Sequence, residues 1–518
     1  MSTPNAQVVG QALAEVLPRD NAPWYRVPHL LSLNILLLIP LMSSSVAGYD
    51  GSLMNGLQAL PSWKNEFGNP KGYTLGAVNA AQSAGCVLAL PVCGILSDRI
   101  GRRYTLLLGG VIIVIASVIQ SVSVNLGMFI FSRVVVGVGG IISVQPSPLL
   151  ISELCYPTHR GIYTALFWTC YYLGAIIAAW STFGLQKNVP ESDWAWRGPS
   201  ILQGGLPLLQ LLFWFKLPES PRWLIAKGRQ DEARSVLARF HTGGDAQHAL
   251  IEFEMNEIET ALEMEVRSKQ TKWTALIEPR NRKRMLITCL IGFFSQWAGN
   301  GVVSYYMTLV LDTVGVTNPD TQTLINGLLQ LFNFFAAVCA AFLVDRLGRR
   351  TLFNWSGIGM LISFTIWTIC SARFAIEDAP SKSLGIAVIA FIFIYFFHYD
   401  IAYTPLVLAY PTEILQYSIR SKGLSVEMGI VYSSLVVLSF VNPIALEAVG
   451  WKYYILFCCI LAVSVVVNWF LLPETKGRSL EEIAELFEDG VVVDSRNASV
   501  KDDEEEGITT HIDIVGGK

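Results

Sequence analysis

Charged residues are scarce in this 518-residue chain, where Asp, Glu, Lys and Arg make up 15% of the residues. About a quarter of the residues of a soluble protein are charged. There is no basic excess either, because 37 Lys and Arg face 41 Asp and Glu, so the composition offers nothing to neutralise a phosphate backbone. With 52% hydrophobic residues, these shortages exclude a disordered chain and a nucleic-acid-binding protein. They also argue against an ordinary soluble enzyme.

The sequence also lacks the residue patterns of metal, nucleotide and hydrolytic sites. Its nine cysteines lie almost entirely within apolar runs, and never in the Cys-x-x-Cys spacing of a metal site. There are six histidines, and the motifs H-E-x-x-H, G-x-S-x-G and G-x-x-x-x-G-K-[ST] do not occur. We therefore expect no metal, no cofactor and no enzymatic activity. Without an ATP-binding loop, any work has to be driven by a gradient.

Long apolar segments fill most of the chain, and the mean hydropathy is +0.45. A hydrocarbon core about 30 Å thick requires about 20 apolar residues in a helix, and the sequence offers twelve such segments. We predict an all-α membrane protein whose twelve transmembrane helices form two pseudo-symmetric six-helix bundles. The predicted spans are 29–52, 74–96, 104–123, 127–150, 162–184, 197–216, 284–311, 323–344, 351–371, 384–410, 422–444 and 452–472.

Polar stretches divide the chain into five predicted parts. The loops after the second and eighth spans are rich in Arg, whereas those after the third and seventh contain no Lys or Arg. By the positive-inside rule, both termini are expected in the cytoplasm. The predicted parts are a cytoplasmic N-terminal segment (1–28), an N-terminal bundle (29–216), a cytoplasmic linker with surface helices (217–283), a C-terminal bundle (284–472) and a cytoplasmic acidic tail (473–518).

The two halves of the chain repeat each other. The segment Asp98–Arg103 returns as Asp345–Arg350, and both read Asp-Arg-x-Gly-Arg-Arg. Glu153 and Arg160 return as Glu413 and Arg420 at a similar offset. Pro218-Glu219 likewise returns as Pro473-Glu474. These matches indicate duplication of a six-helix unit. Such pseudo-symmetry is typical of secondary transporters, in which two bundles rock about a site at the midplane.

The duplicated Arg motif has two readings. It can be a topogenic cluster that keeps these loops in the cytoplasm. It can also be a switchable lock, in which Arg side chains pair with Glu153 or Glu413 when the inner side is closed and separate when it opens. Two copies in the same register favour the lock. The predicted gating residues are Asp98, Arg99, Arg102, Glu153, Arg160, Glu219, Asp345, Arg346, Arg349, Glu413, Arg420 and Glu474.

Taken together, these motifs resemble the sugar porter family of the major facilitator superfamily. The matching pieces are Asp98–Arg103, Arg133-x-x-x-Gly137-x-Gly139-Gly140, Pro148–Gly161, Pro218–Leu224, Tyr305-Tyr306, Asp345–Arg350 and Pro473–Gly477. The resemblance covers about residues 48–485 and implies the major facilitator fold and sugar transport by alternating access. Within the family, Gly48–Gln58, Gly299–Gly301 and Tyr156–Gly161 look most like fungal lactose-permease-type and cellodextrin-type transporters.

Two charges, Asp50 and Arg133, fall within predicted spans, in the outer half and at similar depth. They either form a structural ion pair or serve as a proton site, since charges inside a membrane are functional candidates by default. Desolvation favours the protonated form of Asp50 and Arg133 favours its carboxylate, so a shift of Arg133 would toggle the proton. The resemblance favours the proton site, because proton-coupled sugar porters carry Asp here and facilitators commonly do not. We expect proton symport, with a facilitative uniporter or a non-transporting sugar receptor as the alternatives.

Sugar recognition needs amides or carboxylates for hydroxyl groups and aromatic rings for the apolar ring faces. The seventh span offers Gln296, Asn300, Tyr305 and Tyr306, and the resemblance implies that Gln296 occupies a sugar-binding position. In an alternative reading these groups bond only to other helices. Hexose porters have Gln where this chain has Trp168. We therefore expect a disaccharide such as lactose or cellobiose rather than a hexose.

The tenth span adds His398 and Asp400. Asp400 stands where the family carries an acid and is the next candidate for the proton. His398 has no family precedent and is either a core histidine or a ligand contact. We expect the partners to be a sugar, a proton and the lipid bilayer, and we expect a monomer in the plasma membrane.

Overall fold

The computed structural model describes residues 13, 16–17, 23–269, 272–377, 381–476 and 487. Most of the predicted N-terminal segment and nearly all of the predicted acidic tail lie outside these residues. Within them, all regular secondary structure is helical. This confirms the predicted all-α fold.

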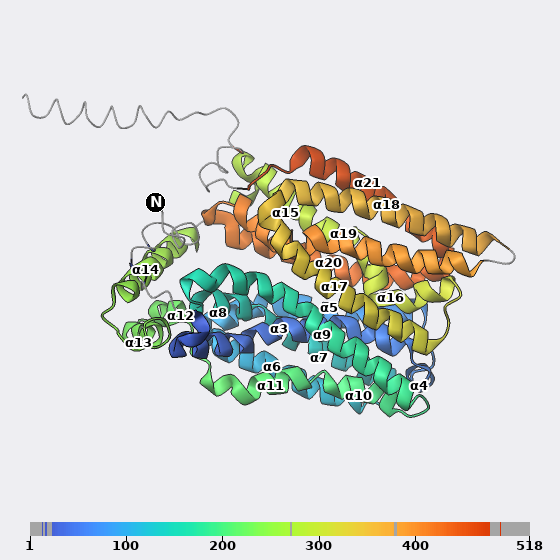
Figure 1. Ribbon diagram of the computed structural model, residues 1–518, viewed down its shortest axis with the longest axis horizontal. Coiled ribbons are helices and arrows are strands. Elements are labelled where there is room, and N and C mark those ends of the chain that lie inside the picture. The colour runs from blue at the N-terminus through green and yellow to red at the C-terminus, as the bar shows by residue number, and fades with distance from the viewer. Residues whose placement is uncertain are drawn as a thin grey trace, which may run out of the picture. The chain divides into compact units, whose positions relative to one another are not determined.

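The first half of the chain forms a bundle of helices, coloured blue to green in Figure 1. Short connections separate most of its helices, and Gly101, with a φ of +96°, makes the tight turn between the second and third spans. The helices are α3 (Pro28–Ala59), the short α4 (Pro61–Glu66), α5 (Gly72–Ile100), α6 (Arg102–Ser121), α7 (Leu126–Val144), α8 (Pro146–Leu154), α9 (Arg160–Asn188), α10 (Trp194–Leu202) and α11 (Gly205–Phe213).

The sixth span is broken into α10 and α11. Pro207 has no N–H to donate to the carbonyl of Gln203, and its ring collides with that carbonyl in a continuous helix. The helix therefore stops at Leu202 and restarts at Gly205. Gln203, which lies at this break, is buried and donates to Asp50 of α3.

The second half repeats the arrangement and is coloured yellow to red in Figure 1. Its seventh span is broken at Gly299, which has a left-handed φ of +100°. The helices are α15 (Pro279–Trp297), α16 (Asn300–Thr313), α17 (Pro319–Leu347), α18 (Arg349–Ile376), α19 (Lys382–Ile414), α20 (Tyr417–Val449) and α21 (Tyr453–Leu471).

Twelve membrane passes follow from these helices. Ten helical stretches in the described ranges are long and apolar enough to cross a membrane, and one of them, Ser418–Leu471, contains both α20 and α21. The pair α10 and α11 supplies the remaining pass. Each predicted span overlaps one of these passes, so the prediction of twelve transmembrane helices is confirmed.

Between the bundles, the linker forms α12 (Pro221–Ala226), α13 (Gln230–His241), α14 (Ala249–Lys269) and the short η4 (Trp273–Ile277). Phe240 and Leu250 bury their side chains in one apolar cluster with Leu33, Leu150 and Leu154 of the N-terminal bundle. His241 and Glu254, each 2% exposed, form a pair at 2.7 Å, and the other ring nitrogen of His241 lies 3.1 Å from the carbonyl of Leu154. The linker helices are thus fixed to the first bundle.

The two bundles meet mainly where α5 packs on α20, α9 on α17 and α3 on α16, and smaller contacts join α3 with α17 and α9 with α19. Close backbone contact aligns α3 with α9 inside the first bundle, because a Cβ on Gly48 would lie 1.7 Å from the carbonyl oxygen of Tyr171. Small residues allow this approach in membrane helices. We call the end that carries Gly101, Gly348 and the linker the Arg-rich end. The opposite end, which carries α4, is the far end.

Candidate functional site

A cavity of about 290 Å³ lies between the two bundles. This is near the lower end of the range for small-ligand pockets, roughly 300–1,000 Å³. Helices of both bundles line it. The polar and aromatic lining residues are Ser52, Asn55, Trp168, Tyr171, Tyr172, Ser295, Gln296, Asn300, Ser304, Tyr305, Gln330, Asn333, Phe396, Tyr399, Tyr403, Thr404 and Tyr432.

Four predicted sugar residues line this cavity, namely Trp168, Gln296, Asn300 and Tyr305. The amide of Asn300 donates to the hydroxyl of Tyr399 (3.2 Å), which donates to the carbonyl of Ser295 (2.8 Å). The side-chain oxygen of Asn300 has no partner among the described residues. Amide groups therefore face the cavity beside aromatic rings, which is the combination that a sugar requires.

The other three predicted sugar residues are not among the cavity-lining residues. The hydroxyl of Tyr306 donates to the carbonyl of Ser439. The ring of His398 packs against Gly359 of α18, and its Nδ1 lies 2.8 Å from the carbonyl of Ile394 on its own helix. Asp400 is fully buried behind the cavity wall.

Asp400 joins the two bundles. One of its carboxylate oxygens accepts from Tyr172 of α9 (2.5 Å) and from Thr404 (2.8 Å). Its other oxygen has no partner among the described residues. Tyr172 and Thr404 both line the cavity. Asp400 therefore does not line the cavity itself but orients two hydroxyl groups in its wall.

The eighth span supplies cavity residues that the sequence analysis missed. Gln330 and Asn333 of α17 line the cavity, and Gln330 donates to Asn326 at 3.4 Å. These three polar residues recur at spacings of four and three within an apolar helix, so they share one face. That spacing was the signal that could have identified them.

At the far end, α3 is hydrogen-bonded to the backbone of α16. Asn55 donates to the carbonyls of Val303 (3.0 Å) and Ser304 (2.6 Å) and accepts from the amide of Met307 (3.1 Å). Gln58 donates to the carbonyl of Tyr305 at 2.9 Å. These backbone groups are available because α16 is kinked at Tyr306, whose φ is −139°. We call these bonds of Asn55 and Gln58 the far-end clamp.

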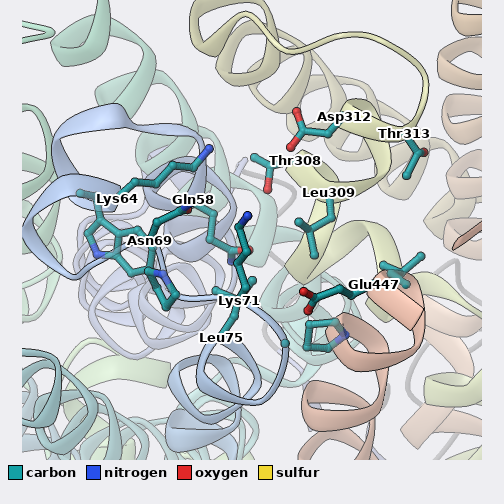
Figure 2. A pocket seen from close by; sticks show the side chains of 15 residues that line it. Gln58, Lys64, Asn69, Lys71, Leu75, Thr308, Leu309, Asp312, Thr313 and Glu447 are labelled. Carbon is teal, nitrogen blue, oxygen red and sulfur yellow. The ribbon is translucent and has the colours of Figure 1, made fainter. Parts of the chain in front are cut away.

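A second cavity of about 550 Å³ lies beyond this clamp, and Figure 2 shows its side chains. The first bundle contributes Lys64 and Lys71, and the second contributes Asp312 and Glu447. In Figure 2 the two lysines extend into the space from one side, and the two acids stand on the other. No ion pair within 4.0 Å joins them in the described part of the chain. We call this cavity the far-end vestibule.

Asp50 and Arg133 are each 1% exposed and lie close enough for a Coulombic interaction. Each of them bonds to an amide side chain. Asp50 accepts from Gln203, and Arg133 donates to Gln82 of α5 at 2.5 Å. The second oxygen of Asp50 and two nitrogens of Arg133 have no partner among the described residues. These atoms could form an ion pair between Asp50 and Arg133 if the two side chains moved closer together.

At the Arg-rich end, the first bundle carries a network around Arg102. Its guanidinium lies 3.4 Å from Glu153 of α8 and 3.4 Å from Asp98. Glu219 accepts from the backbone amides of Arg102 (3.0 Å) and Arg103 (3.2 Å), and Ser220 donates to Glu153. Burial raises the pKa of Glu219, and the amide hydrogen bonds oppose this.

The second bundle repeats this network almost atom for atom. Arg349 lies 3.1 Å from Glu413, Glu474 accepts from the amides of Arg349 (2.9 Å) and Arg350 (3.1 Å), and Thr475 donates to Glu413 at 2.6 Å. Gly348 has a φ of +91°, as Gly101 has +96°. The pairs Arg102–Glu153 and Arg349–Glu413 each join two helices of the same bundle.

The remaining predicted gating residues are more peripheral. Arg99 and Arg346 are exposed, and the carbonyl of Arg346 accepts from Lys476 at 2.6 Å. Arg160 is partly buried at the start of α9, and Arg420 donates to the carbonyl of Leu415 at 3.2 Å. The side chain of Asp345 lies outside the described residues.

Two pseudo-symmetric bundles around a polar and aromatic cavity, with matched networks at one end, define a secondary transporter of the major facilitator superfamily. The chain matches the family described as "Sugar (and other) transporter" over residues 36–487, and it belongs to this family.

Relatives and solved structures agree with this assignment. The chain is 30% identical over 468 residues to the sugar transporter STL1 of Saccharomyces cerevisiae, covering 86% of this chain and 80% of that protein. It is 28% identical over 465 residues to the low-affinity glucose transporter HXT1 of the same yeast, with coverage of 86% and 80%. The fold matches the proton:xylose symporter XylE with a TM-score of 0.71, 22% identity and coverage of 88% and 99%, and XylE of E. coli in an inward-open conformation with a TM-score of 0.74.

Proposed function

We propose that this protein is a proton-coupled sugar symporter that works by alternating access, with the 290 Å³ cavity as the sugar site. The observation that carries this proposal is the cavity itself, which both bundles line with amides, hydroxyls and aromatic rings. Rocking of the bundles would expose it to one side of the membrane at a time. The buried charges of Asp50 and Arg133 support the proton coupling.

We further propose that the Arg-rich end faces the cytoplasm of a fungal-type cell and that the far end faces outward from the plasma membrane. The Arg-rich loops support this orientation through the positive-inside rule. Both termini are then cytoplasmic. In this orientation the far-end clamp closes the outer side, and the two networks at the Arg-rich end serve the inner gate.

For the substrate, we propose a sugar larger than a hexose, such as lactose or cellobiose. Trp168 supports this, because it places a large ring in the cavity wall where hexose porters have an amide. The competing substrate is a hexose or xylose, since the relatives are named for glucose and xylose transport. A facilitative uniporter and a non-transporting receptor are the alternative functions.

Uptake of labelled sugars into cells that lack their own carriers tests this proposal. We expect a disaccharide to accumulate, and we expect a proton uncoupler to abolish the accumulation. Equilibration without accumulation would indicate a uniporter, and binding without uptake would indicate a receptor.

The substrate proposal has its own test in Trp168→Gln. This change should raise the ratio of hexose to disaccharide uptake at equal surface expression, because an amide reaches ring hydroxyls where the indole does not. An unchanged ratio would assign Trp168 to packing alone.

A further inference from the structure

The structure contains a buried acid that none of the roles above uses. Glu427 lies on α20, is 0% exposed, and neither of its carboxylate oxygens has a hydrogen-bond partner among the described residues. Asp50 and Asp400, the other fully buried acids discussed above, each bond through one oxygen. A carboxylate stripped of water and of partners is far more costly than a neutral carboxylic acid. This environment therefore favours the protonated form of Glu427.

Glu427 points at the helix that carries the sugar site. A Cβ on Gly292 of α15 would lie 3.1 Å from Cγ of Glu427, so a glycine at this position leaves room for the acid. Three residues beyond Gly292, Ser295 lines the sugar cavity, and on α20 the adjacent Met428 lines it too. About one helical turn, roughly 5 Å, thus separates Glu427 from the cavity along the α15–α20 seam.

No charged group of the described residues interacts with Glu427. From α15, the titratable group that faces it is the thiol of Cys289. On the side of α20 that meets α5, Tyr432 and Cys86 pack against an apolar cluster that contains Cys93. The nearest cations along the two helices, Arg284 on α15 and Lys422 on α20, lie toward the Arg-rich end, where Arg284 adjoins Gln416.

The α15 side of this seam ends at a break in the seventh span. The last turn of α15 ends at Trp297, and Gly299 breaks the span before α16 begins. A bend at this break shifts α15 against α20. Such a shift would connect Glu427 with cavity water, whereas the present packing seals it.

We propose that Glu427 is a second proton-binding site, loaded and emptied through the α15–α20 seam as the sugar cavity changes sides. This inference rests on the proposed sugar–proton symport. One proton passes from water to a carboxylate oxygen of Glu427 on one side of the membrane, and returns to water on the other. With a neutral sugar and one proton each on Asp50 and Glu427, two positive charges cross the membrane per sugar.

The experiment is a measurement of protons per sugar. The protein is reconstituted into liposomes with the sugar that the uptake panel identifies, and the ratio is obtained from the potential at which coupled sugar flux reverses. We expect two protons per sugar in the unaltered protein and one in Glu427→Gln, which keeps the shape of the neutral acid. Asp320→Asn, an exposed acid in the same bundle, is the matched control and should keep the ratio of two.

The outcomes separate this inference from the proposed function. A ratio of one in the unaltered protein overturns the second site and leaves the symport standing, and this result does not depend on any variant folding. An unchanged ratio of two in a well-expressed Glu427→Gln protein also overturns it. A ratio of zero overturns the symport and the second site together.

Discussion

The two ends of the molecule are held together by different chemistry. At the Arg-rich end, the charged pairs Arg102–Glu153 and Arg349–Glu413 each lie within one bundle. At the far end, neutral hydrogen bonds from Asn55 and Gln58 cross from one bundle to the other. Alternating access has to break the contacts between bundles in every cycle, and neutral hydrogen bonds with a net worth of about 0.5–1.5 kcal/mol each suit that purpose. The stronger charged bonds fix, within each bundle, the helix ends that form the proposed inner gate.

The largest effect is expected at the Arg-rich end. Glu413→Gln removes the charge that faces Arg349 in a partly buried pair, and Glu153→Gln does the same for Arg102. Hydrogen bonds to charged groups contribute about 1.5–3 kcal/mol, so each change should lower transport roughly tenfold or more. Sugar binding from outside should remain, because neither residue lines the cavity. Uptake and equilibrium sugar binding, measured on the same membranes, check this.

The matched control for these variants is Glu377→Gln, which breaks the exposed pair with Arg373 in the same bundle. An exposed pair contributes about 0–1 kcal/mol, so transport should hardly change. Loss of sugar binding with an intact conformational cycle in Glu413→Gln would refute the assignment of this network to the gate.

A smaller effect is expected from the far-end clamp. Asn55→Leu removes the bonds to Val303, Ser304 and Met307 and should shift the equilibrium toward the state open at the far end by about 1–3 kcal/mol, or roughly 5- to 150-fold. Labelled-sugar binding to right-side-out and inside-out vesicles measures this shift. Asn188→Ala, which removes an amide bonded to its own helix at the same end, should leave the two affinities alone. If both affinities of Asn55→Leu equalled those of the unaltered protein, the clamp would not hold the bundles closed.

The smallest effect is expected in the far-end vestibule. Lys64→Glu places a third acid in a space that already holds Asp312 and Glu447, and it should favour the state open at the far end by up to about fivefold, because exposed pairs contribute about 0–1 kcal/mol. Combining it with Asp312→Lys should restore the original balance, and added salt should weaken both effects. The same vesicle assay applies. If the double variant showed the same shift of the equilibrium as Lys64→Glu alone, attraction across the vestibule would be excluded.

The twelve spans were predictable because a membrane helix has to be apolar along most of its length, and the local composition of the sequence shows this directly. The hydrogen-bond partners of the buried charges inside the bundles were not predictable from the sequence. Gln203 reaches Asp50 through the packing of α10 on α3, and Gln82 reaches Arg133 through the packing of α5 on α7. Such pairings depend on helix rotation, which hydropathy does not specify.

The single buried acid in the eleventh span was missed for a related reason. Glu427 follows Arg420 by seven residues, so on the sequence it looks like part of a charged helix end, and only the packing of α20 on Gly292 shows that it is buried. Conversely, His398 was considered for the sugar site, and the rotation of α19 turns it toward α18. Polar residues inside apolar spans are easy to recognise in the sequence, but the direction in which their side chains point is not.

Asp50 and Glu427 differ in a way that separates their variants. Neutralising Asp50 leaves the nearby charge of Arg133 without its counter-charge, so a sugar-free carrier would have to reorient with an uncompensated buried cation. Glu427 has no such neighbour among the described residues. We therefore expect Glu427→Gln to cycle with one proton fewer, and Asp50→Asn to be unable to return empty.

Uphill accumulation by the Asp50→Asn protein tests the central claim of proton-coupled sugar transport most directly. The measurement compares accumulation of labelled sugar at several external pH values with exchange of labelled for unlabelled sugar, at matched surface expression. The account predicts that Asp50→Asn keeps sugar binding and exchange while losing accumulation and its dependence on external acidity. If the charge only supported the fold, protein level and every activity would fall together. Concentrative, pH-dependent uptake by a well-expressed Asp50→Asn protein would contradict the account and move the proton to another acceptor.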